Sequence, residues 1–499
     1  MAVYNYVVIG GGLAGGRAVE GIRQVDEDGT IVLITEESYR PYERPPLSKK
    51  YLQSEAGLDR VFLRDESYYE ERNIEIIQEK KVLHLIPAEK KVLAEDGLEL
   101  SYEKLLLATG GQAIRLDLPG NNLSNVFTLR TINDSQSIRD AAGNGKTALV
   151  MGGSFIGTEV TASLTQLGTK VVQIFPENRL LERVVPQEGS DYLFDLFTGK
   201  GVHILPGVVA SQLNGENRVQ SAALDNGEKM DVDLVVMGIG IRLNTELAEE
   251  AGLSVRDSDK AVVVDKFLQT TDPDIYAAGD IAAWPDVTFE QRLRVEHWDV
   301  ARRQGRRAGR NMAGENEPYT TLPYFFSDLF DLSFEVWGNL SAWDQTVTRG
   351  SVESGSFAFY YFYSGRLVGV FAADRPGDER EPMQALVKAQ PHYLEVAELL
   401  QKDETDLSEL AGLKPEPEKQ GSESDKLSFA EDIAPLFREK DVAEMKEISE
   451  FDLSKYEDVK ERADLIYERL LDETMPCDEP WSEDQIDTFK RWMEGGKHP

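Results

Sequence analysis

Two glycine-rich stretches, Gly10-Gly11-Gly12-Leu13-Ala14-Gly15 and Gly152-Gly153-Ser154-Phe155-Ile156-Gly157, decide the fold class of this chain. Each follows an apolar run of strand type, residues 6–9 and 148–151, and each opens a stretch with helical spacing. Glycine lets the backbone turn tightly and approach a pyrophosphate, which then lies at the N-terminus of the following helix. One such motif is weak evidence, but two in this strand–turn–helix context predict two dinucleotides, one bound flavin and one exchangeable nicotinamide.

The composition is that of a globular protein with several domains. The chain has 499 residues, of which 41% are hydrophobic, enough for three or four domains with substantial cores. There is no apolar run long enough to span a membrane. Residues 1–3 lead straight into the first strand without a basic segment or cleavage site, so a cytoplasmic protein is expected.

The charge and the cysteine content exclude several classes of binding partner and electron acceptor. A net charge of −35 disfavours nucleic acid and anionic lipid, which need a cationic footprint. The acidic field suits a basic protein carrier, or it keeps the surface soluble, as in a saline habitat. The single cysteine, Cys477, excludes an intrachain disulfide and a CxxC redox pair beside the flavin, so electrons must leave to an external acceptor. No metal site is predicted.

Strand and helix signals alternate along residues 5–120 and again along residues 146–240, as in βαβ units. In the first series the strand at residues 31–34 ends near Glu36, an acidic residue placed to accept hydrogen bonds from a ribose. In the second series the strand at residues 171–174 is followed by Glu177.

The order of later strands predicts an insertion. Apolar strands at residues 234–237 and 261–264 precede a turn, a strand and a Gly-Asp pair within residues 270–280. This order predicts that the nicotinamide domain is inserted into the flavin domain. Residues 324–373 then alternate aromatic and polar side chains, which indicates an antiparallel sheet.

The predicted fold class is α/β, with two interleaved doubly wound (Rossmann-like) domains, an α+β C-terminal interface domain and a small helical tail. The antiparallel sheet includes a hairpin turn at Ser364-Gly365, and helical residues follow it to Leu410. A charged segment with Pro and Ser then reads as a linker. The expected boundaries are 1–115 with 245–320 (FAD), 116–244 (NAD(P)H), 321–412 (interface), 413–427 (linker) and 428–499 (tail).

Six further motifs follow one another along the chain: residues 41–49 (PYERPPLSK), 108–111 (ATGG), 157–159 (GTE), 173–177 (QIFPE), 278–280 (AGD) and 294–297 (RVEH). With them the chain resembles the FAD-dependent, ferredoxin-reductase-like branch of the pyridine nucleotide–disulfide oxidoreductases. Within that branch it is most similar to apoptosis-inducing factor and its prokaryotic relatives. The resemblance covers residues 3 to about 375.

The resemblance implies how FAD is held. The first glycine motif would hold the pyrophosphate, Glu36 the adenosine ribose, and Asp280 the ribityl chain or the pyrophosphate edge. Arg44 and Lys49 would lie along the flavin. The predicted cofactor-binding residues are Gly10, Gly12, Ala14, Gly15, Glu36, Arg44, Lys49, Ala108, Thr109, Gly110, Gly152, Gly153, Phe155, Ile156, Gly157, Glu159, Glu177, Gly240, Gly279, Asp280, Glu296, His297 and Phe326.

Lys49 and Glu159 are the predicted catalytic pair. The resemblance implies an ion pair beside the reactive edge of the flavin, where a lysine stabilises negative charge developing on reduction. Glu159 would hold the lysine and compensate its charge, because an unpaired buried ammonium is costly. Glu296 and His297 would lie at the far side of the flavin, and for His297 a structural and a chemical role both stay open.

Coenzyme preference follows from residue types. Glu177 offers a carboxylate to a ribose diol, which favours NADH over NADPH, although Arg179 is close. Two features depart from the family. Phe326 stands where the family commonly has Trp, and Phe lacks the indole donor. The long insertion of the mitochondrial apoptosis protein is not recognisable between Ala373 and Lys388, so redox-driven dimerisation and a death-related role do not carry over.

Residues 428–499 look like the frame of a small c-type cytochrome, but the haem-attachment motif CxxCH is absent. The tail is therefore expected to be a helical docking or packing module, or a haemless relic that contacts an electron carrier.

The resulting prediction is an FAD-dependent NADH oxidoreductase that passes electrons to a ferredoxin- or rubredoxin-like protein. Alternatives are a quinone or oxygen reductase, and an NADH-sensing protein with slow turnover. A homodimer is possible.

Overall fold

The computed structural model describes residues 2–412, 427–449, 451–471 and 481–494, together with 475 and 497–498. The chain divides into two compact units, Met1–Leu413 and Lys414–Pro499. The expected linker at 413–427 lies almost wholly outside the described residues, and so does Cys477.

The first sheet of the larger unit is built around β1, which pairs in parallel with β2 on one side and β6 on the other. β3 extends the sheet beyond β2, and β18 pairs with the end of β6. β4 and β5 form an antiparallel hairpin against the start of β6. The strands are β1 (Ala2–Ile9), β2 (Ile31–Ile34), β3 (Ile74–Ile77), β4 (Val82–Ile86), β5 (Lys91–Ala94), β6 (Glu99–Leu107) and β18 (Ile275–Ala277).

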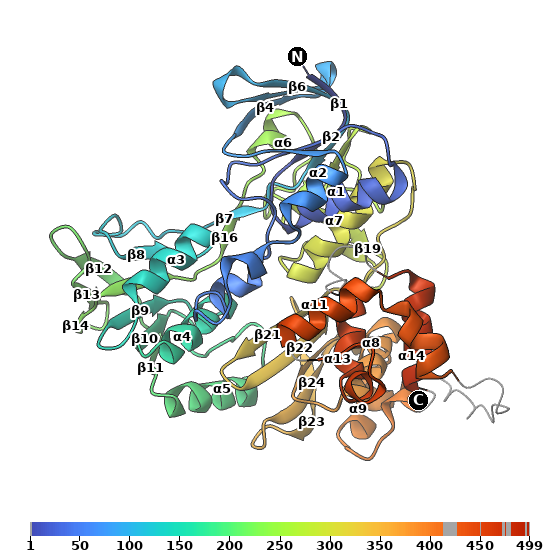
Figure 1. The fold of residues 1–499 in the computed structure, drawn as a ribbon. Coiled ribbons are helices and arrows are strands. Elements are labelled where there is room, and N and C mark those ends of the chain that lie inside the picture. Colours follow the sequence, from blue (N-terminus) through green and yellow to red (C-terminus); the bar gives the residue numbers. More distant parts are fainter. Residues whose placement is uncertain are drawn as a thin grey trace. The chain divides into compact units, whose positions relative to one another are not determined.

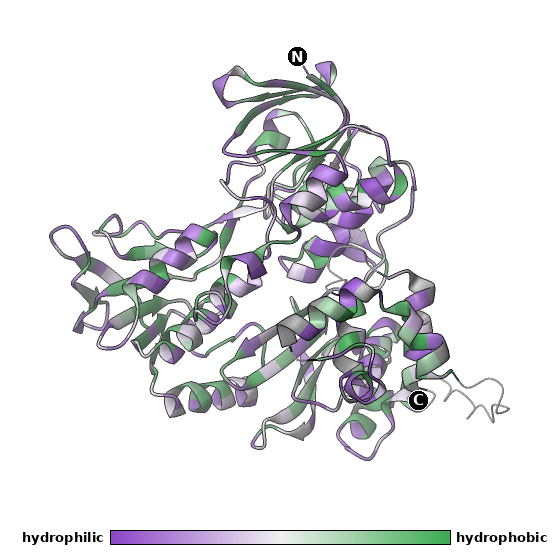
Figure 2. Cartoon of the chain, in the orientation of Figure 1, coloured by the Kyte–Doolittle hydropathy of each residue, from purple (hydrophilic) through white to green (hydrophobic). Residues whose placement is uncertain are grey.

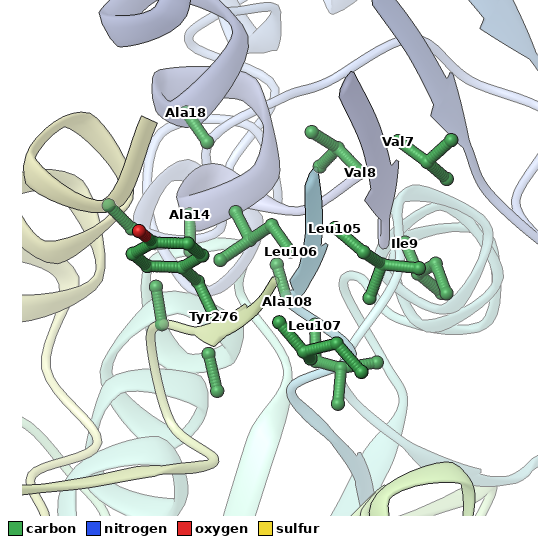
Figure 3. Close-up of a cluster of buried hydrophobic side chains, with 14 of the residues drawn as sticks. Val7, Val8, Ile9, Ala14, Ala18, Leu105, Leu106, Leu107, Ala108 and Tyr276 are labelled. Carbon is green, nitrogen blue, oxygen red and sulfur yellow. The ribbon is translucent and has the colours of Figure 1, made fainter. Parts of the chain in front are cut away.

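Two helices, α1 (Leu13–Val25) and α7 (Trp298–Met312), pack against each other beside this sheet (Figure 1). β-Branched and leucine side chains of β1 and β6 fill the core on both faces of the sheet: Val8 and Leu106 lie on the side of α1, and Val7 and Ile9 on the other (Figure 3). Such runs suit strands that are buried on both faces. Short flanking elements are α2 (Glu66–Glu71), α6 (Glu246–Glu250), β17 (Val262–Val263), β19 (Ala282–Asp286) and β20 (Gln291–Leu293).

The second sheet repeats the architecture, with five parallel strands in the order β11-β10-β9-β15-β8. A capping box between Thr131 and Asp134 begins α3. The elements are β8 (Val126–Thr128), α3 (Ile132–Ala141), β9 (Thr147–Met151), α4 (Phe155–Gln166), β10 (Lys170–Phe175), α5 (Gln187–Gly199), β11 (His203–Pro206) and β15 (Leu234–Met237), with an antiparallel addition of β12 (Ala210–Asn214), β13 (Ser221–Leu224) and β14 (Lys229–Asp231).

The two sheets are joined by a pair of crossing strands. β7 (Gly111–Ala113) leaves the first sheet and β16 (Ile241–Leu243) returns to it, and the two pair antiparallel (Figure 1). The second sheet is therefore an insertion between β7 and β16, in the order that the sequence predicts. The exact domain boundaries given above stay predictions.

A third, antiparallel sheet follows in the order β21-β22-β25-β24-β23. Its predicted hairpin turn is found at Ser364-Gly365, between β24 and β25. Hydrophobic residues are frequent along the strands, and hydrophobic and hydrophilic residues alternate along the helices (Figure 2). The elements are β21 (Tyr324–Leu329), β22 (Leu332–Gly338), β23 (Gln345–Ser351), β24 (Ser356–Tyr363), β25 (Arg366–Ala373), α8 (Arg380–Ala389), α9 (Tyr393–Leu400) and α10 (Leu407–Leu410).

The smaller unit is helical in its described parts and has its own core. Its helices are α11 (Glu439–Ser449), α12 (Tyr456–Glu461), α13 (Ala463–Leu471) and α14 (Glu483–Glu494). Large side chains fill the core, among them Phe429, Phe437, Trp481, Phe489 and Trp492. The end of the chain closes this unit, because the carbonyl of His498 accepts hydrogen bonds from the Phe429 amide (2.8 Å) and the Trp492 indole (2.7 Å). Across the described part of the chain, no helix is long and apolar enough to cross a membrane.

Candidate functional site

The first glycine turn is built for close backbone approach. Gly10 has a φ of +117°, and a Cβ there would lie 2.2 Å from the carbonyl oxygen of Ala108. A Cβ at Gly15 would lie 1.9 Å from the Gly10 carbonyl. Gly12 is the N-cap of α1, and a Cβ there would meet only a guanidinium nitrogen of Arg44, at 4.0 Å. Open space beside free helix N–H groups suits an anion such as a pyrophosphate.

The helix behind this turn is held by α7. A Cβ at Gly279 would lie 3.1 Å from the Ala14 methyl, and one at Gly305 would lie 2.2 Å from the Ala14 carbonyl. The Gly279 amide also donates to the buried Gln304 side chain (3.0 Å). Ala14 and Gly279 are therefore small because two backbones meet there.

Carboxylates follow β2, as predicted, but they do different things. Glu36 is exposed, and no hydrogen bond or ion pair joins its side chain to another described residue. Its neighbour Glu37 accepts a hydrogen bond from Arg44 (2.9 Å) and another from the Tyr42 hydroxyl. Glu36 is thus available to a ribose, whereas Glu37 orients Arg44 and was not identified from the sequence.

Asp280 pairs with Arg130 at 2.8 Å, and the backbone carbonyl of Arg130 accepts a hydrogen bond from Arg44. A Cβ at Gly110 would lie 3.3 Å from the Arg130 guanidinium. The Nε of Arg130 is buried and has no partner among the described groups. Arg130 is a second residue that sequence reasoning missed, because nothing in its immediate sequence marks it as facing the Gly-Asp pair.

The loop after β6 is fastened to the returning strand. The Thr109 hydroxyl donates to the Asn244 carbonyl (2.5 Å), and the Asn244 amide donates to the Gly110 carbonyl (2.9 Å). The Asn244 side chain returns a hydrogen bond to the Thr109 carbonyl (3.1 Å). Gly240, which precedes β16, has a φ of +105°. These bonds fix Thr109 and Gly110 where the two sheets meet.

The second glycine turn repeats the first. Gly152 has a φ of +130°, and its Cβ would lie 2.3 Å from the Gly238 carbonyl oxygen. A Cβ at Gly157 would lie 2.2 Å from the Gly152 carbonyl, and one at Gly153 would lie 2.6 Å from the Phe175 ring. The next two residues are more open, since Phe155 is half-buried and Ile156 is exposed.

Glu177 follows β10, with its carboxylate 3.7 Å from the guanidinium of the exposed Arg183. Arg179, whose charge complicates the coenzyme preference, contacts residues of its own segment. Its guanidinium lies 3.6 Å from Glu182 and 3.5 Å from the hydroxyl of Ser190. Arg179 is therefore already engaged with its own segment.

Lys49 and Glu159 form the ion pair that the resemblance implies, with 2.6 Å between Nζ and Oε1. Lys49 follows a 3₁₀ turn, η1 (Pro45–Ser48), and Glu159 lies in the first turns of α4. Ser48 donates to Oε2 at 2.5 Å, and Ser327 of β21 donates to Oε1. Glu159 is buried with 7% exposure, so this carboxylate is stabilised by three donors from both flanking domains.

The His297 ring stacks on Phe325, with the ring centroids 4.0 Å apart and the planes inclined by 26°. Desolvation lowers the pKa of His297 from 6.5 to about 4, against the opposing field of Asp280, so the imidazole is neutral near pH 7. Phe325 in turn meets Phe155 edge-on at 4.9 Å. Glu296 is exposed and pairs with Arg294 at 2.5 Å, away from this stack.

Strand alternation separates Phe326 from that group. Residues 325 and 327 share the face of β21 that meets His297 and Glu159, so Phe326 points to the other face. There it is 40% exposed and lies edge-on to Trp298 at 6.1 Å. The structure brings Phe325, not Phe326, against His297, and a cofactor contact for Phe326 stays a prediction. Phe325 was not predicted as a site residue, although the alternation of side chains along a strand would have placed it on the opposite face from Phe326.

Comparison with known families gives two matches in chain order. Residues 4–305 match the family described as pyridine nucleotide-disulphide oxidoreductase, and residues 324–411 match the reductase C-terminal domain. The chain belongs to the pyridine nucleotide-disulphide oxidoreductase family. The first match spans both glycine turns and Glu159, and the second includes Phe325 and Ser327.

Relatives of known activity cover most of the chain. It is 35% identical over 381 residues to the 5,5'-dehydrodivanillate O-demethylase ferredoxin reductase subunit of Sphingobium sp., covering 76% of this chain and 92% of that protein. It is 33% identical over 371 residues to the rubredoxin-NAD(+) reductase of Pseudomonas putida, covering 74% and 96%. The crystal structure of the covalent putidaredoxin reductase–putidaredoxin complex aligns with a TM-score of 0.78 at 29% identity, covering 83% of this chain and all of that one.

The family and its ferredoxin-reductase-like branch are therefore confirmed, and the protein is an FAD-dependent oxidoreductase that uses a pyridine nucleotide. The two Rossmann-like domains and the C-terminal reductase domain are confirmed as well. The greater similarity to apoptosis-inducing factor stays a prediction.

The residues of the first turn fit FAD. Space beside Gly12, the free carboxylate of Glu36 and the partnerless buried Nε of Arg130 offer an anion site, a ribose acceptor and a donor. Arg44 and Asp280 lie between them, within one connected set of hydrogen bonds. The role of each of these residues stays a prediction.

Proposed function

We propose that the protein is an NADH-dependent reductase that delivers electrons to a small ferredoxin- or rubredoxin-like protein. The observation that carries the proposal is the Lys49–Glu159 pair, which lies where the glycine-turn domains and β21 meet. Relatives named as ferredoxin and rubredoxin reductases support the class of acceptor. The single cysteine, Cys477, leaves no dithiol in the chain to accept electrons.

When bound, FAD would supply the hydride-accepting and one-electron-donating chemistry that such a reductase needs. Lys49 supplies a positive charge that favours the reduced cofactor, and Glu159 keeps this ammonium from being buried alone. His297, neutral near pH 7, adds no charge of its own. Phe155 and Phe325, which meet edge-on, add apolar surface beside His297.

We infer that NADH is preferred over NADPH. Glu177 presents a carboxylate to the adenosine ribose, and a 2′-phosphate at that position would be repelled. The engagement of Arg179 with Glu182 and Ser190 supports this preference, because its guanidinium is withheld from such a phosphate.

The tail is proposed to be a haemless packing or docking module with a cytochrome-like frame. Aromatic side chains fill its core, which supports a module that needs no haem to fold. A cytoplasmic location and a homodimer stay predictions.

An anaerobic NADH titration that follows flavin absorbance, and then adds oxidised ferredoxin or rubredoxin, tests the proposal. We expect rapid bleaching, and recovery that quickens with the carrier protein. Lys49→Met should slow flavin reduction by about tenfold to a hundredfold, because one charge-assisted contact is lost. Lys50→Met, at the exposed neighbouring lysine, is the matched control and should change little.

Slow bleaching to a long-lived complex that no carrier reoxidises would contradict the proposal and favour the NADH-sensing alternative. Fast reoxidation by quinone or air alone would point to the quinone or oxygen reductase. Equal rates for the Lys49 and Lys50 variants would contradict the role given to Lys49.

A further inference from the structure

The Glu159 carboxylate has more partners than an ion pair needs. Lys49 and Ser327 both donate to Oε1, and Ser48 donates to Oε2. These donors come from separate parts of the chain. Lys49 and Ser48 belong to the segment after β2, whereas Ser327 belongs to β21 of the C-terminal domain. The carboxylate therefore joins three domains at one point.

The two hydroxyls are as buried as the carboxylate itself. Ser48 and Ser327 are each 2% exposed, and Glu159 is 7% exposed. Each of the two carboxylate oxygens therefore accepts a hydrogen bond from one of these hydroxyls. Neither serine is close in sequence to Glu159, so the arrangement depends on the folded contact between domains.

We propose that Ser48 and Ser327 are positioning residues that fix the Glu159 carboxylate and, through it, the Lys49 ammonium. The C-terminal domain would thereby take part in setting the reduction potential of the flavin. This inference rests on the proposed function only in placing Lys49 beside the flavin.

The position of the Lys49 ammonium depends on how strongly the Glu159 carboxylate attracts it. A lysine side chain is a flexible point charge, so its position follows the field of its partner. The two hydroxyls supply part of the stabilisation that a buried carboxylate needs. When one hydroxyl is removed, the carboxylate depends more on the ammonium and draws it away from the cofactor. The reduced flavin is then less stabilised, and its potential falls.

The test compares flavin midpoint potentials, measured by anaerobic redox titration of the FAD-loaded full-length protein. Ser327→Ala should lower the potential by about 30 mV, which corresponds to a tenfold change for a two-electron couple. Ser48→Ala should shift it in the same direction, and Ser327→Thr, which keeps the hydroxyl, should recover most of the change. Ser333→Ala is the matched control, because it removes a serine hydroxyl that donates to an exposed carboxylate, Asp328 (2.6 Å), in the same domain.

A double variant separates positioning from general loosening. If Ser327 acts through the lysine, Ser327→Ala should cause no further shift in a Lys49→Met background. An equal shift in both backgrounds would overturn the inference, and so would a Ser327→Ala potential equal to that of Ser333→Ala. If Ser327→Ala loses FAD, Ser48→Ala decides by the same criteria.

Failure of the proposed function is distinguishable from failure of this inference. Potentials are measured without NADH turnover or a carrier protein. A protein that reduces no carrier but shows the predicted pattern of potentials contradicts the proposed function alone.

Discussion

The two glycine turns have nearly the same backbone, but the residues that begin the helices behind them differ in burial. Gly10 and Gly152 have φ values of +117° and +130°, and each leaves no room for a Cβ. Behind Gly10, α1 is buried from Leu13 to Ile22 and lies under α7. Behind Gly152, α4 is buried from Gly157 to Leu164, but the N-cap Ser154 and Ile156 before that stretch are exposed.

This difference indicates which of the two nucleotides stays bound between turnovers. The first turn also has Gly12 at the position that Ser154 occupies in the second turn, so a ligand can approach the backbone of the first turn more closely. In the second turn, by contrast, Glu159 and its ion pair with Lys49 lie only one helical turn further along α4. We infer that the first turn retains FAD, whereas the second receives and releases NADH.

The largest effect should come from breaking each turn separately. Gly10→Ala forces an L side chain into a left-handed conformation and against the Ala108 carbonyl, so we expect protein without bound flavin. Gly152→Ala meets the Gly238 carbonyl in the same way, but it should leave a yellow protein whose flavin dithionite still reduces and NADH does not. Flavin content and anaerobic absorbance titrations measure both.

Gly143→Ala is the matched control for these substitutions. Its φ of +123° imposes the same backbone strain, but a Cβ there would meet open space. We expect it to keep both flavin and NADH reduction. If Gly152→Ala also lost its flavin, the separation of the two turns into a permanent and an exchangeable site would be wrong.

A smaller effect is expected in the domain of the second glycine turn, where Glu177→Ala should reduce the preference for NADH over NADPH. Loss of hydrogen bonds between a carboxylate and a ribose predicts about a tenfold change in the ratio of kcat/KM values. Glu228→Ala, in an exposed turn of the same domain, should leave the ratio unchanged. An unchanged ratio in the Glu177 variant would remove this carboxylate from coenzyme recognition.

Sequence patterns predicted those parts of the fold that depend on neighbouring residues in the chain. The glycine turns, β15 at residues 234–237 and the Ser364-Gly365 hairpin lie where the sequence places them. The short strands β12 to β14 were not predicted, because three to five residues of mixed polarity carry no clear period. Residues such as Arg130 and Ser327 were missed for another reason. Their partners, Asp280 and Glu159, lie more than a hundred residues away in sequence, and only tertiary packing brings them together.

His297, the N-cap of α7, tests how far solvent is excluded from the region around its ring. Its folded pKa of about 4 lies below the usual histidine value of 6.5, so between these values the unfolded chain binds more protons. The stability that the neutral ring contributes is therefore present above pH 6.5 and lost as the pH falls towards 4. The total is at most about 3 kcal/mol.

Denaturant unfolding at pH 7 and pH 4.5 measures this contribution. His297→Gln cannot titrate, so it should lose less stability than the wild type over that interval. His203→Gln, at an exposed histidine of β11, should follow the wild type. Parallel losses in all three proteins would mean that His297 is solvated, and that this side of the molecule is as open as the second turn.

The smallest effect is expected from removing the tail. The unit Lys414–Pro499 has its own core and contains neither glycine turn, so a chain ending at Leu413 should keep its FAD and its rate of reduction by NADH. Two measurements suffice, the ratio of flavin to protein and the bleaching rate against the full chain. If the shortened chain lost its flavin, the tail would be part of what closes the first turn. The contrast between the two turns would then no longer be explained by the packing of α7 on α1 alone.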